Sequence, residues 1–331
     1  GGAIGNSVDT IVNTANIDLT IDSTDAGLMT SGVTITGGTG TDAMIVTADA
    51  ADTIDFTNIT KVDSLTIRDG SLSGDDVTVS LGAYATALTI DASALNGTDE
   101  VLTVDGNSAT KALTITASGG ADEITGGAGN DTITLGSGND TYNEFDGNDS
   151  VTGGAGNDTF DIADAQLSYL DSIDGGAGND TIELDNTTAV TDVDFQNVSN
   201  TEYVTMDSGA ASVTLGSYAS AGGITKITGI AATANTINAV AMGTGITMVA
   251  ATATGMHDVL TGGTGVDTFV FSGITGLQDG DTLTGTAGAD VIQLDNTSAA
   301  VTAEADFDDI ATLTNITVKD NDGGDATSAE A

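Results

Sequence analysis

The chain has no cysteine, no proline and no tryptophan, and its 331 residues include only 5 Lys and Arg against 49 Asp and Glu. Without cysteine there are no disulfides and no thiolate metal sites. The formal charge of −44 excludes nucleic-acid binding, which needs clustered Lys and Arg, and it disfavours contact with anionic membranes. Cations are therefore the natural partners of this chain.

Long apolar runs are also missing. The nearest candidate for a membrane span, residues 227–256, carries no charge but is rich in Thr, Asn and Gly, so we expect no membrane insertion. This stretch is either a lateral contact between subunits or a buried, Thr-faced part of the fold. Aromatic residues make up only 4% of the chain, yet 39% of it is hydrophobic, in short alternating runs of Val, Ile and Thr that favour folded β-structure over disorder.

A nine-residue period is the strongest pattern in the sequence. Aspartates recur at this interval at Asp122, Asp131, Asp140, Asp149 and Asp158, from Asp171 to Asp180, from Asp258 to Asp267, and from Asp281 to Asp290. Two residues after each aspartate comes a large, mostly apolar side chain. A glycine-rich half followed by a Thr–apolar half predicts a turn and a short strand, coiled so that the apolar position faces inward. We therefore predict an all-β, right-handed parallel β-roll or β-helix solenoid.

Larger repeats enclose the small one. The sequence segments that begin at Gly37, Gly175 and Gly285 resemble one another. This indicates a tandem array of which this chain is a segment. We expect residues 1–36 to end a preceding module and 37–174 to form a first module, with a regular calcium-binding roll at about 117–163. Residues 175–284 then form a second module, with motifs at about 175–183 and 253–270, and residues 285–331 begin a truncated third.

The glycine–aspartate motif has the chemistry of a calcium site. Glycine permits left-handed backbone, which turns carbonyl oxygens and the carboxylate toward one point, and such hard oxygens suit Ca²⁺ better than Mg²⁺. A nine-residue half-turn places each motif beside the second one along the chain. This predicts one ligand set of Asp122, Asp140 and Asp158 and another of Asp131 and Asp149, with several ions bridging successive coils. The predicted backbone positions are Gly126, Ala128, Gly153, Ala155, Gly175 and Ala177.

Four segments resemble the repeats-in-toxin (RTX) nonapeptide, glycine-glycine-x-glycine-x-aspartate-x-apolar-x. They are GGAGNDTIT (126–134), GGAGNDTFD (153–161), GGAGNDTIE (175–183) and GGTGVDTFV (262–270). The resemblance implies a calcium-loaded parallel β-roll. The copies at 117–125 and 144–152 are degraded in the glycine half, and the copy at 135–143 has Leu135 at its first glycine. The looser modules resemble RTX-type bacterial surface-layer (S-layer) proteins exported by the type I pathway.

The sequence is compatible with three functions. The first is an extracellular, cell-surface structural protein, a repeat segment of a self-assembling layer, fibre or sheath built from like subunits. The second is a spacer or an ice- or surface-binding region of a large adhesin, with outward Thr as its active face. The third is the calcium-folding export domain of a secreted enzyme. We predict no enzymatic activity in the chain itself, since it has no Trp to stack on sugars and His257 has no evident catalytic partner.

Overall fold

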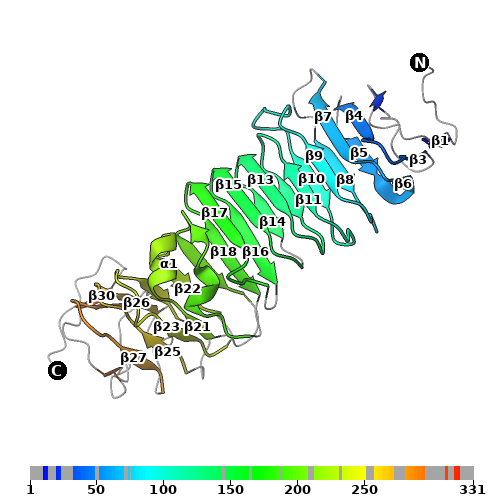
Figure 1. The fold of residues 1–331 in the computed structure, drawn as a ribbon. Coiled ribbons are helices and arrows are strands. Elements are labelled where there is room, and N and C mark those ends of the chain that lie inside the picture. Colours follow the sequence, from blue (N-terminus) through cyan, green and yellow to red (C-terminus); the bar gives the residue numbers. More distant parts are fainter. Residues whose placement is uncertain are drawn as a thin grey trace. The chain divides into compact units, whose positions relative to one another are not determined.

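The structure, a computed structural model, describes residues 10–13, 20–23, 33–48, 52–70, 74, 76–143, 146–163, 166–185, 188–207, 212–230, 233–250, 257–271, 280–294, 310–311 and 317–320. They fall into two units: unit 1 contains residues up to 161 together with 170–180, and unit 2 contains 162–169 and residues from 181 onward. Within each unit, short strands stack in parallel ladders (Figure 1).

Unit 1 is built from coils that contribute one strand to each of two long parallel sheets. The first sheet contains, in spatial order, β5 (Asp52–Asp55), β8 (Val77–Ser80), β10 (Leu102–Asp105), β12 (Glu123–Thr125), β14 (Thr141–Asn143) and β16 (Thr159–Ala163). The second contains β2 (Thr20–Ser23), β4 (Ala43–Ala48), β7 (Ser64–Asp69), β9 (Leu88–Asp91), β11 (Leu113–Thr116), β13 (Thr132–Ser137), β15 (Ser150–Ala155) and β17 (Ser172–Ala177). A small third sheet joins β1 (Thr10–Val12), β3 (Thr34–Thr36) and β6 (Ile59–Thr60), and the 3-10 turn η2 spans Phe56–Asn58.

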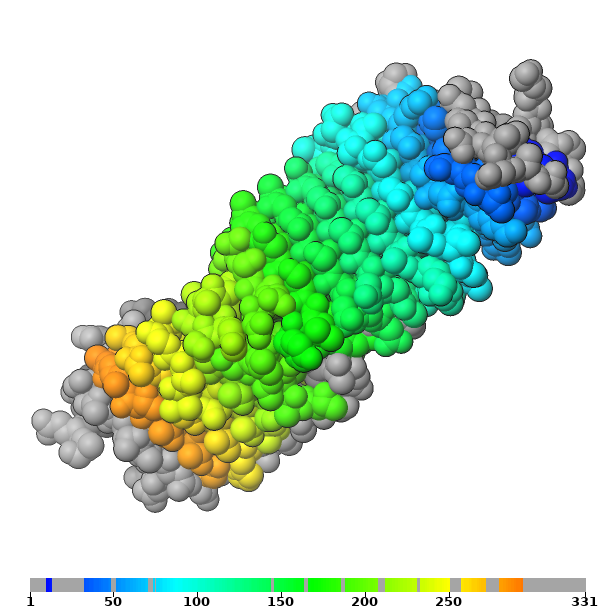
Figure 2. All heavy atoms as spheres, viewed as in Figure 1, coloured from blue at the N-terminus to red at the C-terminus, as the bar shows by residue number. Residues whose placement is uncertain are grey.

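The core of unit 1 consists of apolar ladders, in which each side chain lies on its counterpart one coil away. One ladder contains Val79, Val104, Ile124, Tyr142 and Phe160, in strict strand register. All five are at most 1% exposed, and full burial of such a side chain is worth about 1.5–3 kcal/mol. In Figure 2 the coils of this unit form successive bands of colour from blue to green.

Unit 2 repeats this plan with strands that are mostly three or four residues long. One sheet contains β18 (Thr181–Asp185), β20 (Tyr203–Met206), β22 (Lys226–Thr228), β24 (Thr247–Val249), β26 (Thr268–Phe271), β28 (Val291–Leu294) and β30 (Thr317–Asp320). The other contains β21 (Ser212–Thr214), β23 (Thr236–Asn238), β25 (Val259–Thr261), β27 (Thr282–Thr284) and β29 (Ile310–Ala311). The remaining elements are β19 (Val198–Ser199), the 3-10 turn η3 (Asp192–Phe195) and the helix α1 (Ser217–Gly222).

Helix α1 is a feature that the sequence patterns did not predict. Its first turn is capped from a distant part of the chain, because the Asp192 carboxylate accepts hydrogen bonds from the amides of Tyr218 and Ala219. The helix ends at Gly222 and is followed by Gly223, whose φ of 106° is left-handed, as is common one residue beyond a helix end. Of these two signals only the terminal glycine is local in sequence.

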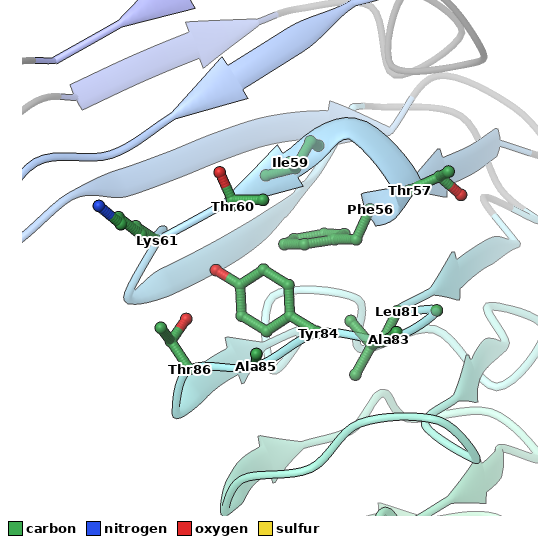
Figure 3. Close-up of a pocket in the computed structure, with 11 residues that line it drawn as sticks. Phe56, Thr57, Ile59, Thr60, Lys61, Leu81, Ala83, Tyr84, Ala85 and Thr86 are labelled. Atoms are coloured by element: carbon green, nitrogen blue, oxygen red, sulfur yellow. The ribbon is translucent and has the colours of Figure 1, made fainter.

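A cavity in unit 1 lies beside η2 and the loop after β8 (Figure 3). The Tyr84 ring stands edge-on to Phe56, with ring centres 5.3 Å apart and planes at 87°. The Tyr84 hydroxyl accepts a hydrogen bond from the Val62 amide and donates one to the Val62 carbonyl. This hydroxyl closes an irregular turn between coils. The cavity contains none of the predicted metal ligands.

The predicted parallel β-solenoid is confirmed. The charge-free stretch 227–256 belongs to the solenoid where it is described, since it contributes most of β22 and all of β23 and β24. No helix in the described part of the chain has the length and apolar character needed to cross a bilayer. The module boundaries at 37, 175 and 285 remain predictions.

Candidate metal centre

The aspartates predicted as ligands are all buried. All eleven are at most 3% exposed, an unusual environment for a carboxylate. Each aspartate immediately precedes a short strand, whose second residue is a buried apolar side chain. Because β12 pairs with β14, and β13 with β15, residues 18 apart lie side by side. The prediction that each motif lies beside the second one along the chain is therefore confirmed in this region.

The aspartates that lie side by side in successive coils form columns. Within a column, a hydrogen bond between coils links one aspartate to the next. The Asp122 amide donates to Oδ1 of Asp140 (2.8 Å), and the Asp140 amide donates to Oδ1 of Asp158 (2.9 Å). The same bond joins Asp131 to Asp149, Asp149 to Asp171, Asp158 to Asp180, Asp258 to Asp281 and Asp267 to Asp290. One oxygen of each accepting carboxylate is thus satisfied by backbone, a link that the sequence did not reveal.

The second carboxylate oxygen divides the sites into two kinds. In some sites the protein supplies a donor to Oδ2: the Gly127 amide to Asp131 (2.9 Å), the Ser118 amide to Asp122 (2.8 Å) and the Tyr142 hydroxyl to Asp149 (2.7 Å).

In other sites Oδ2 has no such donor. Oδ2 of Asp140, of Asp158 and of Asp290 is buried and accepts no hydrogen bond. A buried, unsatisfied carboxylate oxygen is costly, so these are the positions at which the structure best fits a cation.

Electrostatics support this reading. Burial raises the pKa of Asp140 to about 7, helped by the charges of Asp122 and Asp158 and opposed by the amide bond from Asp122. Burial likewise raises the pKa of Asp149, Asp158 and Asp267 to about 6. Without a counter-charge, these columns disfavour the ionised carboxylate.

The glycines of the motif make room for the carboxylates and for the stacked turns. A Cβ at Gly153 would lie 2.3 Å from Oδ2 of Asp158, which explains a glycine five residues before the aspartate. A Cβ at Gly156, where φ is 137°, would lie 1.4 Å from the carbonyl oxygen of Gly138 in the neighbouring coil. Only glycine fits such a position without moving backbone.

Of the predicted backbone positions, Gly126 and Ala128 follow β12, whereas the other four lie in the second halves of β15 and β17: Gly153, Ala155, Gly175 and Ala177. The carbonyls of Ala155 and Ala177 accept hydrogen bonds from the amides of Gly138 and Gly156, each 2.9 Å long. A carbonyl oxygen has a second lone pair, so this bond leaves a site for a cation. For Gly126, Ala128, Gly153 and Gly175 a role as ligand also remains a prediction.

No three His, Cys, Asp or Glu side chains within the described ranges gather into a cluster that could hold a metal ion. Within these ranges, an ion in the columns would have at most two such side chains as ligands, and backbone carbonyls or water would complete its coordination. Such an all-oxygen, flexible set suits Ca²⁺, which takes six to eight oxygens, better than Mg²⁺ or a transition metal. The residues present thus fit calcium, whose positive charge would offset the carboxylates.

Comparison with known families agrees with this chemistry. The model of the RTX calcium-binding nonapeptide repeat (4 copies) matches residues 114–142, 146–161, 168–186 and 275–296, about a quarter of the chain. The chain therefore carries RTX calcium-binding repeats. Neither the curated proteins nor the solved structures include a match.

Asp42 is a candidate that our sequence interpretation missed. It is 1% exposed, and its Oδ2 accepts a hydrogen bond from the Gly38 amide at 2.6 Å, as Asp131 does from Gly127. Its own amide donates to the Asp63 carboxylate. The signal was present, since GGTGTDAMI (37–45) is a complete nonapeptide, but we interpreted it only as the start of a module.

Proposed function

We propose that this chain is an extracellular, calcium-dependent structural protein, a repeat segment of a self-assembling layer, fibre or sheath at the cell surface. The observation that carries the proposal is the set of columns of buried aspartates, which include Oδ2 atoms of Asp140, Asp158 and Asp290 without a hydrogen-bond donor. Two carboxylates about 4 Å apart repel by about 4 kcal/mol at an effective dielectric constant of 20. Calcium offsets this repulsion and holds neighbouring coils together.

In this proposal, folding of the chain depends on the calcium concentration, which differs between the inside and the outside of the cell. In a low-calcium cytosol the columns carry uncompensated charge, whereas calcium outside the cell favours the folded solenoid. A site with calcium at ten to a hundred times its Kd gains about 1.4–2.7 kcal/mol. Several such sites together contribute as much free energy as the whole stability of an ordinary domain. This fits secretion of an unfolded chain, as the RTX repeats suggest.

Assembly of like subunits also depends on cations in this proposal. At a formal charge of −44, two copies repel each other unless counter-ions accumulate between them. Calcium therefore acts both within the columns and between chains, and chelation reverses both effects.

A threonine array favours the adhesin alternative. On the sheet that contains β11, β13 and β15, Thr114 pairs with Thr132, and Thr116 with Thr134, which pairs in turn with Thr152. These positions alternate with the buried ladder, so their side chains face outward. Regular hydroxyl rows suit contact with a polar surface, although Asp91 and Asp174 interrupt one of them.

Electron microscopy distinguishes these functions. The full chain is imaged in calcium, in chelator, and in chelator with excess magnesium as the matched ionic control. Sheets or filaments that form in calcium alone support the structural proposal. Monomers that fold in calcium and coat a polar surface without assembling favour the adhesin. A chain that is folded and monomeric in chelator refutes both the calcium dependence and the assembly.

A further inference from the structure

Asn235 occupies an aspartate position in unit 2. β23 pairs with β25 so that Thr236 lies beside Val259, which places Asn235 directly beside Asp258 in the column. Its amide donates to Oδ1 of Asp258 at 2.7 Å, the same link that joins the aspartates of other coils. Like those aspartates, Asn235 is buried, with 1% of its surface exposed.

The side-chain amide of Asn235 is surrounded by oxygens. Nδ2 lies 3.0 Å from Oδ1 of Asp258, 3.1 Å from the Thr233 carbonyl and 3.2 Å from the Ile230 carbonyl. Oδ1 accepts a hydrogen bond from the Ile230 amide at 2.8 Å. The one donor and three acceptors fix the orientation of the amide, since the reverse orientation would place oxygen against three oxygens.

We propose that Asn235 closes its coil without calcium, because the Nδ2 group stands where a cation would otherwise bridge the column. This inference rests on the proposed calcium dependence of the aspartate columns. One carboxylate oxygen and two backbone carbonyls converge on Nδ2, which resembles the donor set of an oxygen-ligated cation. A neutral amide with two N–H donors satisfies those oxygens and adds no charge.

The turn before Asn235 accommodates an asparagine side chain in place of an aspartate. At Asp131 the donor to Oδ2 is the amide four residues earlier, whereas at Asn235 it is the amide five residues earlier, so the turn is one residue longer. A Cβ at Gly229 would lie 2.6 Å from Cγ of Asn235, which shows how closely this turn wraps the side chain. The coil lies in the charge-free stretch 227–256, and the amide explains how a stretch without acids continues the column.

The test is the substitution Asn235→Asp in the full chain, with calcium bound per chain measured by equilibrium dialysis and thermal unfolding measured in calcium and in chelator. Asn235→Asp restores a carboxylate amid the same oxygens, so we expect one more calcium bound than in the unsubstituted chain. We also expect a lower unfolding temperature in chelator, with recovery in saturating calcium.

Two variants serve as controls. Asn238→Asp adds the same charge in the same coil, at a side chain that accepts a hydrogen bond from the Val240 amide and lies away from the column. It should leave the calcium count unchanged. Asn235→Ala removes the amide without adding a carboxylate, and should lower the unfolding temperature in both conditions without changing the count.

The outcomes separate this inference from the proposed function. If the unsubstituted chain binds calcium but Asn235→Asp binds no more than Asn238→Asp, the inference is wrong and the function stands. If Asn235→Asp remains unfolded in saturating calcium, the inference is likewise wrong. An unsubstituted chain that binds no calcium overturns the proposed function and, with it, the inference.

Discussion

Gly156 provides the sharpest test of how the coils stack. Its backbone has a φ of 137°, and a methyl group there would lie 1.4 Å from the carbonyl oxygen of Gly138. An ordinary contact needs about 3.5 Å, so the substitution Gly156→Ala requires the two turns to separate by about 2 Å. Strands in a sheet lie about 4.8 Å apart, so that movement disrupts local pairing.

The expected cost of Gly156→Ala follows from two contributions. A non-glycine residue in such a conformation costs about 1–3 kcal/mol. Separation of the two turns weakens the bond from the Gly138 amide to the Ala155 carbonyl and the bond from the Asp140 amide to the Asp158 carboxylate, at about 0.5–1.5 kcal/mol each. We therefore expect Gly156→Ala to lower the free energy of unfolding by about 2–6 kcal/mol.

The assay is urea unfolding in saturating calcium, followed by circular dichroism. Two variants separate the contributions. At Gly74 the φ is 82° but nothing lies within 4 Å of an added Cβ, so Gly74→Ala should show only the conformational cost. At Gly243 neither constraint applies, so Gly243→Ala should change stability by less than about 0.5 kcal/mol. If Gly156→Ala costs no more than Gly74→Ala, the turns are not stacked as closely as described.

Three further predictions follow from the same structure. The pKa of Asp140 is raised from 3.8 to about 7, so between these pH values the folded chain holds a proton that the unfolded chain has lost. In calcium-free buffer, the free energy of unfolding measured with urea should therefore fall from pH 4 to pH 7. A rise over this range would contradict the prediction. Phe160→Ala should cost about 3–5 kcal/mol because Phe160 is fully buried, whereas Tyr169→Ala, at a half-exposed position, should cost far less in the same assay. Tyr84→Phe should cost about 1–2 kcal/mol in thermal or urea unfolding, since it removes both hydrogen bonds to Val62, and an unchanged midpoint would show that this hydroxyl does not stabilise the turn.

The fold could be predicted from the sequence because one period fixes both strand position and register. The apolar residue two positions after each aspartate, such as Ile124 or Phe160, points inward in every coil. A shift of one residue would expose the whole ladder, so the pattern admits a single register. Helix α1 escaped prediction because its cap, Asp192, is contributed from a distant part of the chain.

The columns could be predicted from spacing, but the state of each carboxylate could not. Asp131 and Asp158 stand in complete nonapeptides, yet Oδ2 of Asp131 has the Gly127 amide as donor and Oδ2 of Asp158 has none. Asp140 follows a degraded glycine half and also has an unsatisfied Oδ2. Completeness of the motif is therefore a poor guide to which carboxylate oxygens have a hydrogen-bond donor within the protein.

Departures from the motif can instead supply replacement donors. The degraded copy at 117–125 has Ser118, whose amide and hydroxyl both donate to Asp122. In the copy at 144–152, Asp149 receives the hydroxyl of Tyr142, which is at the apolar position of the preceding copy. These donors come from the turn or from the preceding half-coil, so they depend on three-dimensional stacking that spacing alone does not encode. The donors to the carboxylates can therefore differ from coil to coil while the strand register stays constant.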